Sequence, residues 1–253
     1  MTLVVSNNDH PAESTHWYTK LGTPAYQVLG KNGKMRNTTL RDAREKNLVP
    51  SVTTILKSAA SPGLERWKID QMLHSALTLP TIVGEREADY LDRIRVDSRE
   101  QGRKAAERGT AVHTAIEGFY LGKGFGAYEE HIKGFESAIT KQFGECSWLA
   151  ERAFATDLGF GGKIDLCSGK AILDAKSKEF GPDTKPEGYD EHLMQLAAYR
   201  MGMDLPAARC ANVFVSVTHP GLVHIHEWNE ADLQRGWKMF VGLLGYWYAK
   251  TGL

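Results

Sequence analysis

Two aspartates and one lysine lie close together in the sequence, at positions where short β-strands are expected. Asp165 lies in a Gly-Gly-Lys-Ile-Asp-Leu run, and an apolar Ala-Ile-Leu run then leads into Asp174 and Lys176. Because side chains alternate along a strand, Asp174 and Lys176 point to the same face of a sheet. Carboxylate oxygens are the ligands that Mg²⁺ or Mn²⁺ prefers, and such an ion activates water and neutralises phosphate. The three residues therefore predict metal-dependent hydrolysis of a phosphodiester.

An Asp-x-Lys pair by itself is more often an exposed salt bridge. Here the apolar run before Asp174 favours a strand of the core, where a charge is costly without a partner. Beside such a metal site, Lys176 would orient or deprotonate the attacking water, or stabilise charge on the phosphate. The sequence leaves these roles open.

Upstream, His113 and Glu117 are four residues apart in a segment that is typical of a helix. This spacing places their Cβ atoms about 5 to 6 Å apart on one face, so both side chains can reach the same ligand. A nitrogen donor added to two carboxylates suits Mn²⁺ or Mg²⁺. An ordinary core or surface histidine is the alternative. Gly109 and Thr110 would let this helix pack closely.

Downstream, Gln195 and Tyr199 have the same spacing on a further expected helix. The alternative is an ordinary amphipathic helix. Because this helix directly follows the strand with Lys176, we expect the amide and the phenol to hold Lys176, metal-bound water or a phosphate. The glutamate Glu151, at the start of the strand before Asp165, would bridge to the site through water or pair with Arg152 or Lys163 at the surface.

Hydrophobic periodicity predicts the elements that must position these residues. Period-two runs predict three consecutive antiparallel strands, and periods of three and four residues predict helices on either side of them. The expected helices span residues 97–121, 129–143 and 189–201 and a terminal helix that begins at Asn229; the expected strands span 151–157, 162–167, 171–176, 213–217 and 222–228.

The front of the chain is expected to be mainly helical. Residues 1–15 form a polar tail, a small hairpin follows near Tyr26 to Leu29, and Ser51 can cap a short helix. Pro62 and Gly63 are expected to break the chain before the next helix. Residues 16–253 are predicted to form a single domain with a helical part over 16–96 and a core over 97–253.

The composition favours a globular protein without staples. Hydrophobic residues make up 42% of the 253 positions, and the formal net charge is zero, so any surface for nucleic acid must be local. Three cysteines without paired spacing disfavour disulfides, a zinc ribbon and an iron–sulfur cluster. No apolar run is long enough to span a bilayer and no signal pattern opens the chain, so an intracellular, cytoplasmic setting without membrane contact is expected.

The order Gly-Thr-x-x-His-x-x-x-Glu, Gly-x-x-Asp, Asp-x-Lys and Gln-x-x-x-Tyr resembles the RecB-like branch of the PD-(D/E)XK nuclease superfamily. The resemblance implies an α/β fold, with a mixed central sheet flanked by helices, as in restriction endonucleases. It also implies site roles: metal ligation by His113, Asp165, Asp174 and the backbone carbonyl of Ala175, with Glu117 as a further candidate, and catalysis by Lys176, Asp165 and Asp174 with support from Gln195 and Tyr199.

The segments Pro-Ser-Val-Thr-Thr-Ile-Leu from position 50 and Leu-Glu-Arg-Trp-Lys from position 64 are similar to a part of mitochondrial genome maintenance exonucleases and of phage nucleases. The resemblance implies an exonuclease for single-stranded DNA ends, guided by the helical part over 16–96. The candidate DNA-binding side chains combine cations with one aromatic ring that can stack on a base. They are Arg66, Trp67, Lys68, Arg103, Lys104 and Arg108.

We therefore expect a metal-dependent deoxyribonuclease that uses one or two Mg²⁺ or Mn²⁺ ions in DNA recombination, repair or replication of a bacterium or a phage-infected host. A sequence- or structure-specific endonuclease, a DNA-end-binding protein without activity, and a metal-binding structural or sugar-processing domain are the alternatives. The chain has no Walker A motif, so unwinding would require a helicase, or a single-strand-binding or annealing partner.

Overall fold

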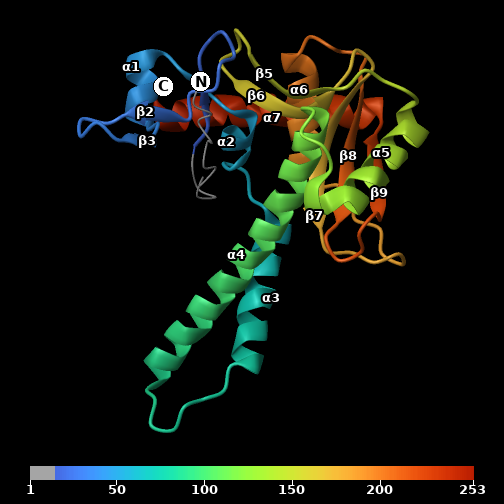
Figure 1. Cartoon of the computed structure of the whole chain (residues 1–253). Helices are drawn as coiled ribbons and strands as arrows, with labels where there is room; N and C mark the ends of the chain where they lie inside the picture. The colour runs from blue at the N-terminus through green and yellow to red at the C-terminus, as the bar shows by residue number, and fades with distance from the viewer. Residues whose placement is uncertain (1–14) are drawn as a thin grey trace.

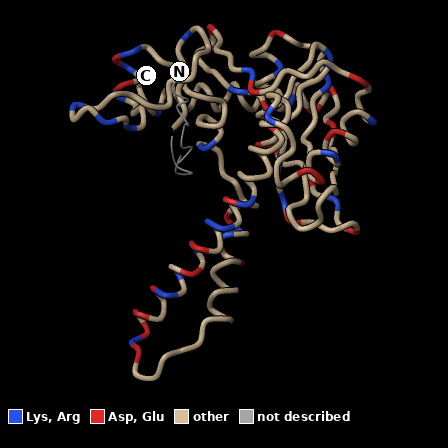
Figure 2. Tube along the Cα trace, in the orientation of Figure 1, with Lys and Arg blue, Asp and Glu red and all other residues tan. Residues whose placement is uncertain are grey.

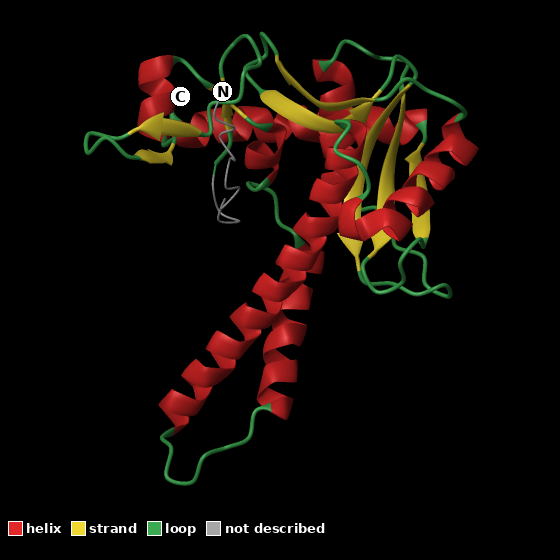
Figure 3. Cartoon of the chain, in the orientation of Figure 1, coloured by secondary structure: helices red, strands yellow, loops and turns green. Residues whose placement is uncertain are grey.

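The computed structural model describes residues 15–253, so the predicted polar tail lies almost wholly outside the described residues. A five-stranded mixed sheet packed with helices follows a largely helical N-terminal region (Figures 1 and 3). The N-terminal elements are β1 (Trp17–Tyr18), β2 (Gln27–Leu29), β3 (Met35–Asn37), α1 (Leu40–Lys46), β4 (Val49–Pro50), α2 (Val52–Leu56), α3 (Pro62–Thr78) and α4 (Glu87–Tyr120). The later elements are η1 (Gly126–Tyr128), α5 (Glu129–Phe143), β5 (Leu149–Ala155), β6 (Gly161–Cys167), β7 (Ala171–Lys178), α6 (Asp190–Gly202), β8 (Arg209–Ser216), β9 (Val223–Trp228) and α7 (Glu230–Thr251).

The central sheet has the strand order β5-β6-β7-β8-β9. All neighbours are antiparallel except β7 and β8, which are parallel. A parallel pair needs a long crossover between its strands, and α6 supplies it. One face of the sheet packs against α6 and α7, and the other packs against α4 and α5. The predicted mixed sheet flanked by helices is confirmed.

Several predicted local signals are present at the helix ends. The Ser51 hydroxyl accepts from the Thr54 amide at the start of α2, and Asn229 caps α7 in the same way through the Asp232 amide. Gly144 ends α5 with a positive φ, which glycine adopts without steric cost. These caps fix where the helices that flank the sheet begin and end.

An arm formed by α3 and α4 projects from the body of the molecule (Figure 1). The prediction of a helix from residue 97 was too short, because α4 begins at Glu87. The sequence held a signal for the earlier start, because Tyr90, Leu91 and Ile94 lie at helical spacing and Ile94 is buried. Acidic and basic positions alternate along the outer part of α4 (Figure 2). Arg86 pairs with Asp89 and Asp92 pairs with Arg95, and the helix packs against α3. The predicted division at residues 96 and 97 therefore falls inside one continuous helix.

Two other predictions were imprecise. Pro62 and Gly63 are the first residues of α3 and do not precede it, because proline at the first helical position lacks only an amide that would be unbonded anyway. The strand expected over residues 151–157 is β5, which begins and ends two residues earlier, since Thr156 to Phe160 form the turn. None of the helices in residues 15–253 combines the length and hydrophobicity needed to cross a bilayer.

Candidate active site

Asp174 and Lys176 lie in β7 and contact α6. The Lys176 ammonium donates to Asp174 Oδ1 at 2.9 Å and to Gln195 Oε1 at 3.2 Å, and it lies 2.8 Å from Asp174 Oδ2. Gln195 Nε2 donates to Asp174 Oδ1 at 2.8 Å and to Tyr199 Oη at 2.9 Å. The four residues predicted from the Asp-x-Lys and Gln-x-x-x-Tyr spacings thus form one hydrogen-bonded cluster. Lys176 remains 31% exposed, so its ammonium is within reach of a substrate.

Asn212 of β8 completes the surroundings of Asp174, and it was missed in the sequence. Its Nδ2 donates to Asp174 Oδ2 at 2.8 Å, and its Oδ1 accepts from Trp228 Nε1 at 2.8 Å. Asn212 is fully buried within an otherwise apolar β-branched strand. A buried amide needs partners, so an asparagine inside an apolar run was the signal that could have identified it.

Asp165 and His113 form the second half of the site. His113 Nε2 of α4 lies 3.0 Å from Asp165 Oδ2, and the Ala175 amide donates to the same oxygen at 2.8 Å. Here β6 and β7 diverge, because their backbone pairing ends at Leu166 and Leu173. Beyond this point the Ala175 amide donates to the Asp165 side chain and not to a backbone carbonyl of β6. The Ser177 hydroxyl donates to the Gly109 carbonyl of α4 at 3.1 Å. A Cβ atom at Gly109 would lie at ordinary van der Waals distance from Ser177, so this contact does not by itself require glycine.

Burial and charge give the two aspartates different proton affinities. Burial raises the pKa of Asp174, and the nearby Asp165 adds to this against the opposing effect of Lys176. For Asp165, burial acts in the same direction, but the hydrogen bond from His113, the charges of His113 and Lys176 and the Ala175 amide outweigh it and lower its pKa. The bond to Asp165 raises the pKa of His113. Burial opposes the charge of Lys176, but both aspartates hold its pKa above the usual range.

Glu117 and Glu151 lie near Asp165 without contacting it directly. Together with His113 and Asp165 they line a cavity of about 10 Å³, close to the size of one water molecule. Glu151 forms an ion pair with Lys163, which was one of the two alternatives predicted for it. The Glu151 side chain, however, is only 12% exposed. The prediction of a surface pair was therefore wrong in its location.

A groove leads from this site along the arm. A cavity of about 340 Å³ is lined by Thr110, His113 and Lys176 among others. It shares Gly109 with a larger cavity of about 680 Å³, which includes Trp67 and Arg108 in its lining. The larger cavity is also lined by Gln71, His74, Gln101 and Lys178. Two of the six predicted DNA-binding residues thus flank one path to the candidate active site.

The other four predicted DNA-binding residues lie elsewhere. Arg103 pairs with Glu100 and Glu107 on its own helix, and Lys104 lies 3.8 Å from Glu100. Lys68 pairs with Glu65, and both line a different cavity beside α2. Arg66 is exposed and lines neither groove cavity.

The donor set fits one hard divalent cation. Mg²⁺ typically takes one or two carboxylates and completes its shell with water and substrate phosphate, and Mn²⁺ also accepts imidazole. His113 and Asp165 supply such a pair, next to Ala175. Over residues 15–253, no three His, Cys, Asp or Glu side chains are arranged as a ready ligand set. Asp174, the third predicted ligand, instead accepts hydrogen bonds from Lys176, Gln195 and Asn212.

His192, at the start of α6, gives a prediction on acid stability. Burial and the charges of Lys176 and Lys178 lower its pKa to about 3, whereas an unfolded histidine titrates near 6.5. Between these values the unfolded chain binds one more proton, so stability falls as pH is lowered through this window, by at most about 1.4 kcal/mol per pH unit. His192→Gln, whose amide oxygen can still accept from the Tyr189 amide, is expected to flatten this slope in urea unfolding measured from pH 7 to 4. His74→Gln on the exposed face of α3 is the control, and an equal slope in wild type and His192→Gln would contradict the prediction.

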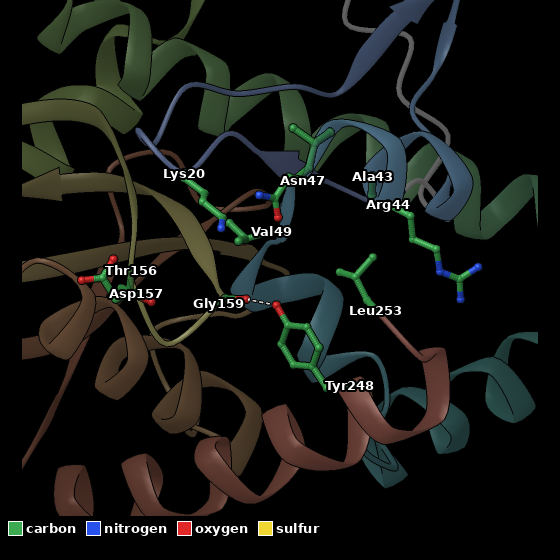
Figure 4. Close-up of a pocket in the computed structure, with 11 residues that line it drawn as sticks. Lys20, Ala43, Arg44, Asn47, Val49, Thr156, Asp157, Gly159, Tyr248 and Leu253 are labelled. Carbon is green, nitrogen blue, oxygen red and sulfur yellow. Dashed lines mark hydrogen bonds between the residues drawn. The ribbon is translucent and has the colours of Figure 1, made fainter.

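A separate cavity of about 350 Å³ lies where α1, the β5–β6 turn and the end of α7 meet (Figure 4). Its lining includes Lys20, Asn47 and Asp157, and the Tyr248 hydroxyl closes one side by donating to the Gly159 carbonyl at 2.6 Å. The residues of this lining differ from those of the candidate active site and of the groove. The cavity is therefore a separate feature of the surface, with no side chain in common with the aspartate and lysine cluster.

Comparison with known proteins does not identify a family for the chain. No protein-family model matches the chain, and no curated protein matches it. Among the solved structures that do match is one described as "Crystal structure of SSO0001", which is 14% identical, with 71% of this chain and 85% of that chain covered at a TM-score of 0.27. A likeness at this level supports no conclusion on activity, so the function must be inferred from the geometry of the site itself.

Proposed function

We propose that the chain is a metal-dependent deoxyribonuclease, similar in its site to the RecB-like branch of the PD-(D/E)XK nucleases. The observation that carries the proposal is the pairing of two clusters at the point where β6 and β7 diverge. One cluster joins Asp174, Lys176 and Gln195, and the other joins Asp165 and His113. Carboxylates, an imidazole and a solvent-accessible ammonium at one strand end match the requirements of phosphodiester hydrolysis.

Each residue has a role that follows from its contacts. Asp165 and His113 would hold one Mg²⁺ or Mn²⁺ ion with the Ala175 carbonyl, and the ion, when bound, supplies charge neutralisation and a more acidic water. Asp174 and Gln195 fix the position of the Lys176 ammonium. Both aspartates hold the pKa of Lys176 above its usual range, against the effect of burial. This favours a role in which the ammonium stabilises charge on the phosphate or orients water.

The groove supports a single-stranded substrate that enters from an end. It runs between α3 and α4 and past the end of β7, with the Trp67 ring for stacking and Arg108 and Lys178 for phosphates. Since the molecule has no net charge, this local set of groups would provide the contact with DNA. We therefore favour exonuclease action, with a helicase or a single-strand-binding protein as the source of the unpaired strand.

A time course on end-labelled DNA tests the proposal. Linear single strands should release nucleotides with Mg²⁺ or Mn²⁺ and none with chelator, whereas circular single strands should stay intact. Cleavage of circles would favour the alternative of a structure- or sequence-specific endonuclease. Binding of ends without any cleavage would favour a non-catalytic DNA-end-binding protein, and neither binding nor cleavage would exclude all three.

The groove makes a prediction on salt dependence. Arg108→Gln should weaken binding of single-stranded DNA and reduce the slope of log affinity against log salt by about 0.7, because one phosphate contact is lost. Arg108 pairs with Glu179 within the groove lining, at 2.7 Å, and a phosphate would replace this exposed partner. Arg103→Gln is the matched control on the same helix, since Arg103 pairs with Glu100 and Glu107 outside the groove. Fluorescence anisotropy from low to high salt measures both. Equal slopes for Arg108→Gln and wild type would argue against the groove as the DNA path.

A further inference from the structure

One residue of β5 has a backbone conformation that its side chain disfavours. Among residues 15–253, three residues other than glycine have a positive φ. Asn47 ends α1 and Asp204 follows α6, and these two residue types tolerate the left-handed region at helix ends. The third is Glu151, with a φ of 57° inside a strand. A glutamate in this region costs on the order of 1 to 2 kcal/mol, whereas glycine would cost nothing there.

The strained residue lies directly across from Asp165. The pairs Ala150 with Leu166 and Arg152 with Ile164 flank it, so the register places Glu151 opposite Asp165, where no backbone pair forms. Both strands change face at this point. Phe154 and Ile164 pack into the core below α6 and α7, whereas Ala150 and Leu166 pack into the core below α4 and α5. This change of face brings Glu151 and Asp165 to the same small cavity.

The Glu151 carboxylate forms an ion pair with Lys163, a cation that would otherwise lack this partner close to Asp165 in the sequence. Lys163 is only two residues before Asp165 on β6. Asp165 Oδ2 meanwhile accepts from the Ala175 amide and lies 3.0 Å from His113 Nε2. If the carboxylate at position 151 were lost, the acids left at this cavity to take up the Lys163 charge would be Asp165 and Glu117.

We infer that Glu151 is a positioning residue of the proposed active site. It binds the Lys163 ammonium, so that the Asp165 carboxylate stays available for its contacts with His113 and the Ala175 amide. The effect on cleavage rests on the proposed function, whereas the effect on the position of Asp165 does not. If only the bend of the strand mattered, glycine would serve at this position with less strain. The strained backbone together with the Lys163 ion pair therefore points to a role for the carboxylate itself.

A double-mutant cycle on the full chain tests this role. Glu151→Gln should lower the cleavage rate at least tenfold, because Lys163 then competes for Asp165. Lys163→Met removes the competing cation but leaves the Glu151 carboxylate unpaired, so it serves as the second single variant of the cycle. The double variant Glu151→Gln/Lys163→Met should recover most of the activity. Glu151→Gly, which keeps the bend and removes the carboxylate, should lose activity as Glu151→Gln does. Wild-type activity in Glu151→Gln or Glu151→Gly, or a double variant as inactive as Glu151→Gln, would overturn the inference.

A second measurement separates this inference from the proposed function. Hydrogen exchange at the Ala175 amide, which donates to Asp165, reports the position of the aspartate without any substrate. Its protection should fall in Glu151→Gln and return in the double variant. Unchanged protection across the cycle would overturn the inference even in an active enzyme. A wild-type protein that cleaves no DNA but shows the fall and the recovery would overturn the proposed function alone.

Discussion

Lys176→Ala is expected to reduce DNA cleavage by about 10² to 10³ or more, while the protein stays folded. The substitution removes the ammonium that both aspartates attract, and removal of one preorganised charge from a reaction centre typically costs this much. Asp174 keeps its hydrogen bonds from Gln195 and Asn212 and loses the one from Lys176. This loss should lower the free energy of unfolding by about 1 to 3 kcal/mol. This is less than the stability of an ordinary domain.

The measurement combines single-turnover cleavage with thermal unfolding and cation titration. Lys170→Ala in the turn between β6 and β7 is the matched control, because Lys170 is exposed and lines neither the site nor the groove. Lys176→Ala should melt a few degrees lower and still bind Mn²⁺ through Asp165 and His113. Wild-type turnover in Lys176→Ala would remove Lys176 from the mechanism.

Asp165→Asn is expected to lose cation binding and cleavage together, with little change in stability. An asparagine oxygen can still accept from the Ala175 amide, so the strand end keeps its shape. The negative charge that a divalent cation requires is lost, and only His113 remains of the proposed ligand pair. Because burial disfavours the Asp165 charge, its removal also relieves desolvation, which offsets the weaker hydrogen bonds.

Isothermal titration with Mn²⁺, followed by cleavage at saturating metal, distinguishes this effect from that of Lys176→Ala. Asp157→Asn in the turn between β5 and β6 is the control, since Asp157 lies at the separate cavity. We expect the affinity of Asp165→Asn for Mn²⁺ to fall at least 30-fold, about 2 kcal/mol. Cleavage that persists with unchanged Mn²⁺ affinity would show that the ion, if required, is held elsewhere.

Local spacing was sufficient to predict much of the candidate site. Asp174 and Lys176 share a face because strands alternate, and Gln195 and Tyr199 do so because of the helical period. Asn212 was not predictable in this way. It contacts Asp174 because β7 and β8 pair in parallel, although the whole of α6 separates the two strands in the sequence. Only the assembled sheet brings these two residues together.

Other features were overlooked in the sequence for different physical reasons. Glu100 and Glu107 lie at helical spacing from Arg103 and Lys104, so the intrahelical ion pairs of these cations could have been predicted. The left-handed backbone at Glu151 has no local signal at all, because the residue type disfavours it. The tertiary packing of two strands that change face imposes that conformation.

The continuity of α4 makes the arm and the candidate active site parts of one lever. A helix of 34 residues is roughly 50 Å long, and His113 lies in its final turns, roughly 40 Å from the first residue, Glu87. A stiff rod that tilts about its anchored end turns through the same angle along its whole length, while the displacement becomes smaller toward the anchor. Pulling or pushing on the outer end of the arm would thus tilt the segment that carries the imidazole. Mechanical load from a strand under tension would reach the chemistry without any intermediate contact.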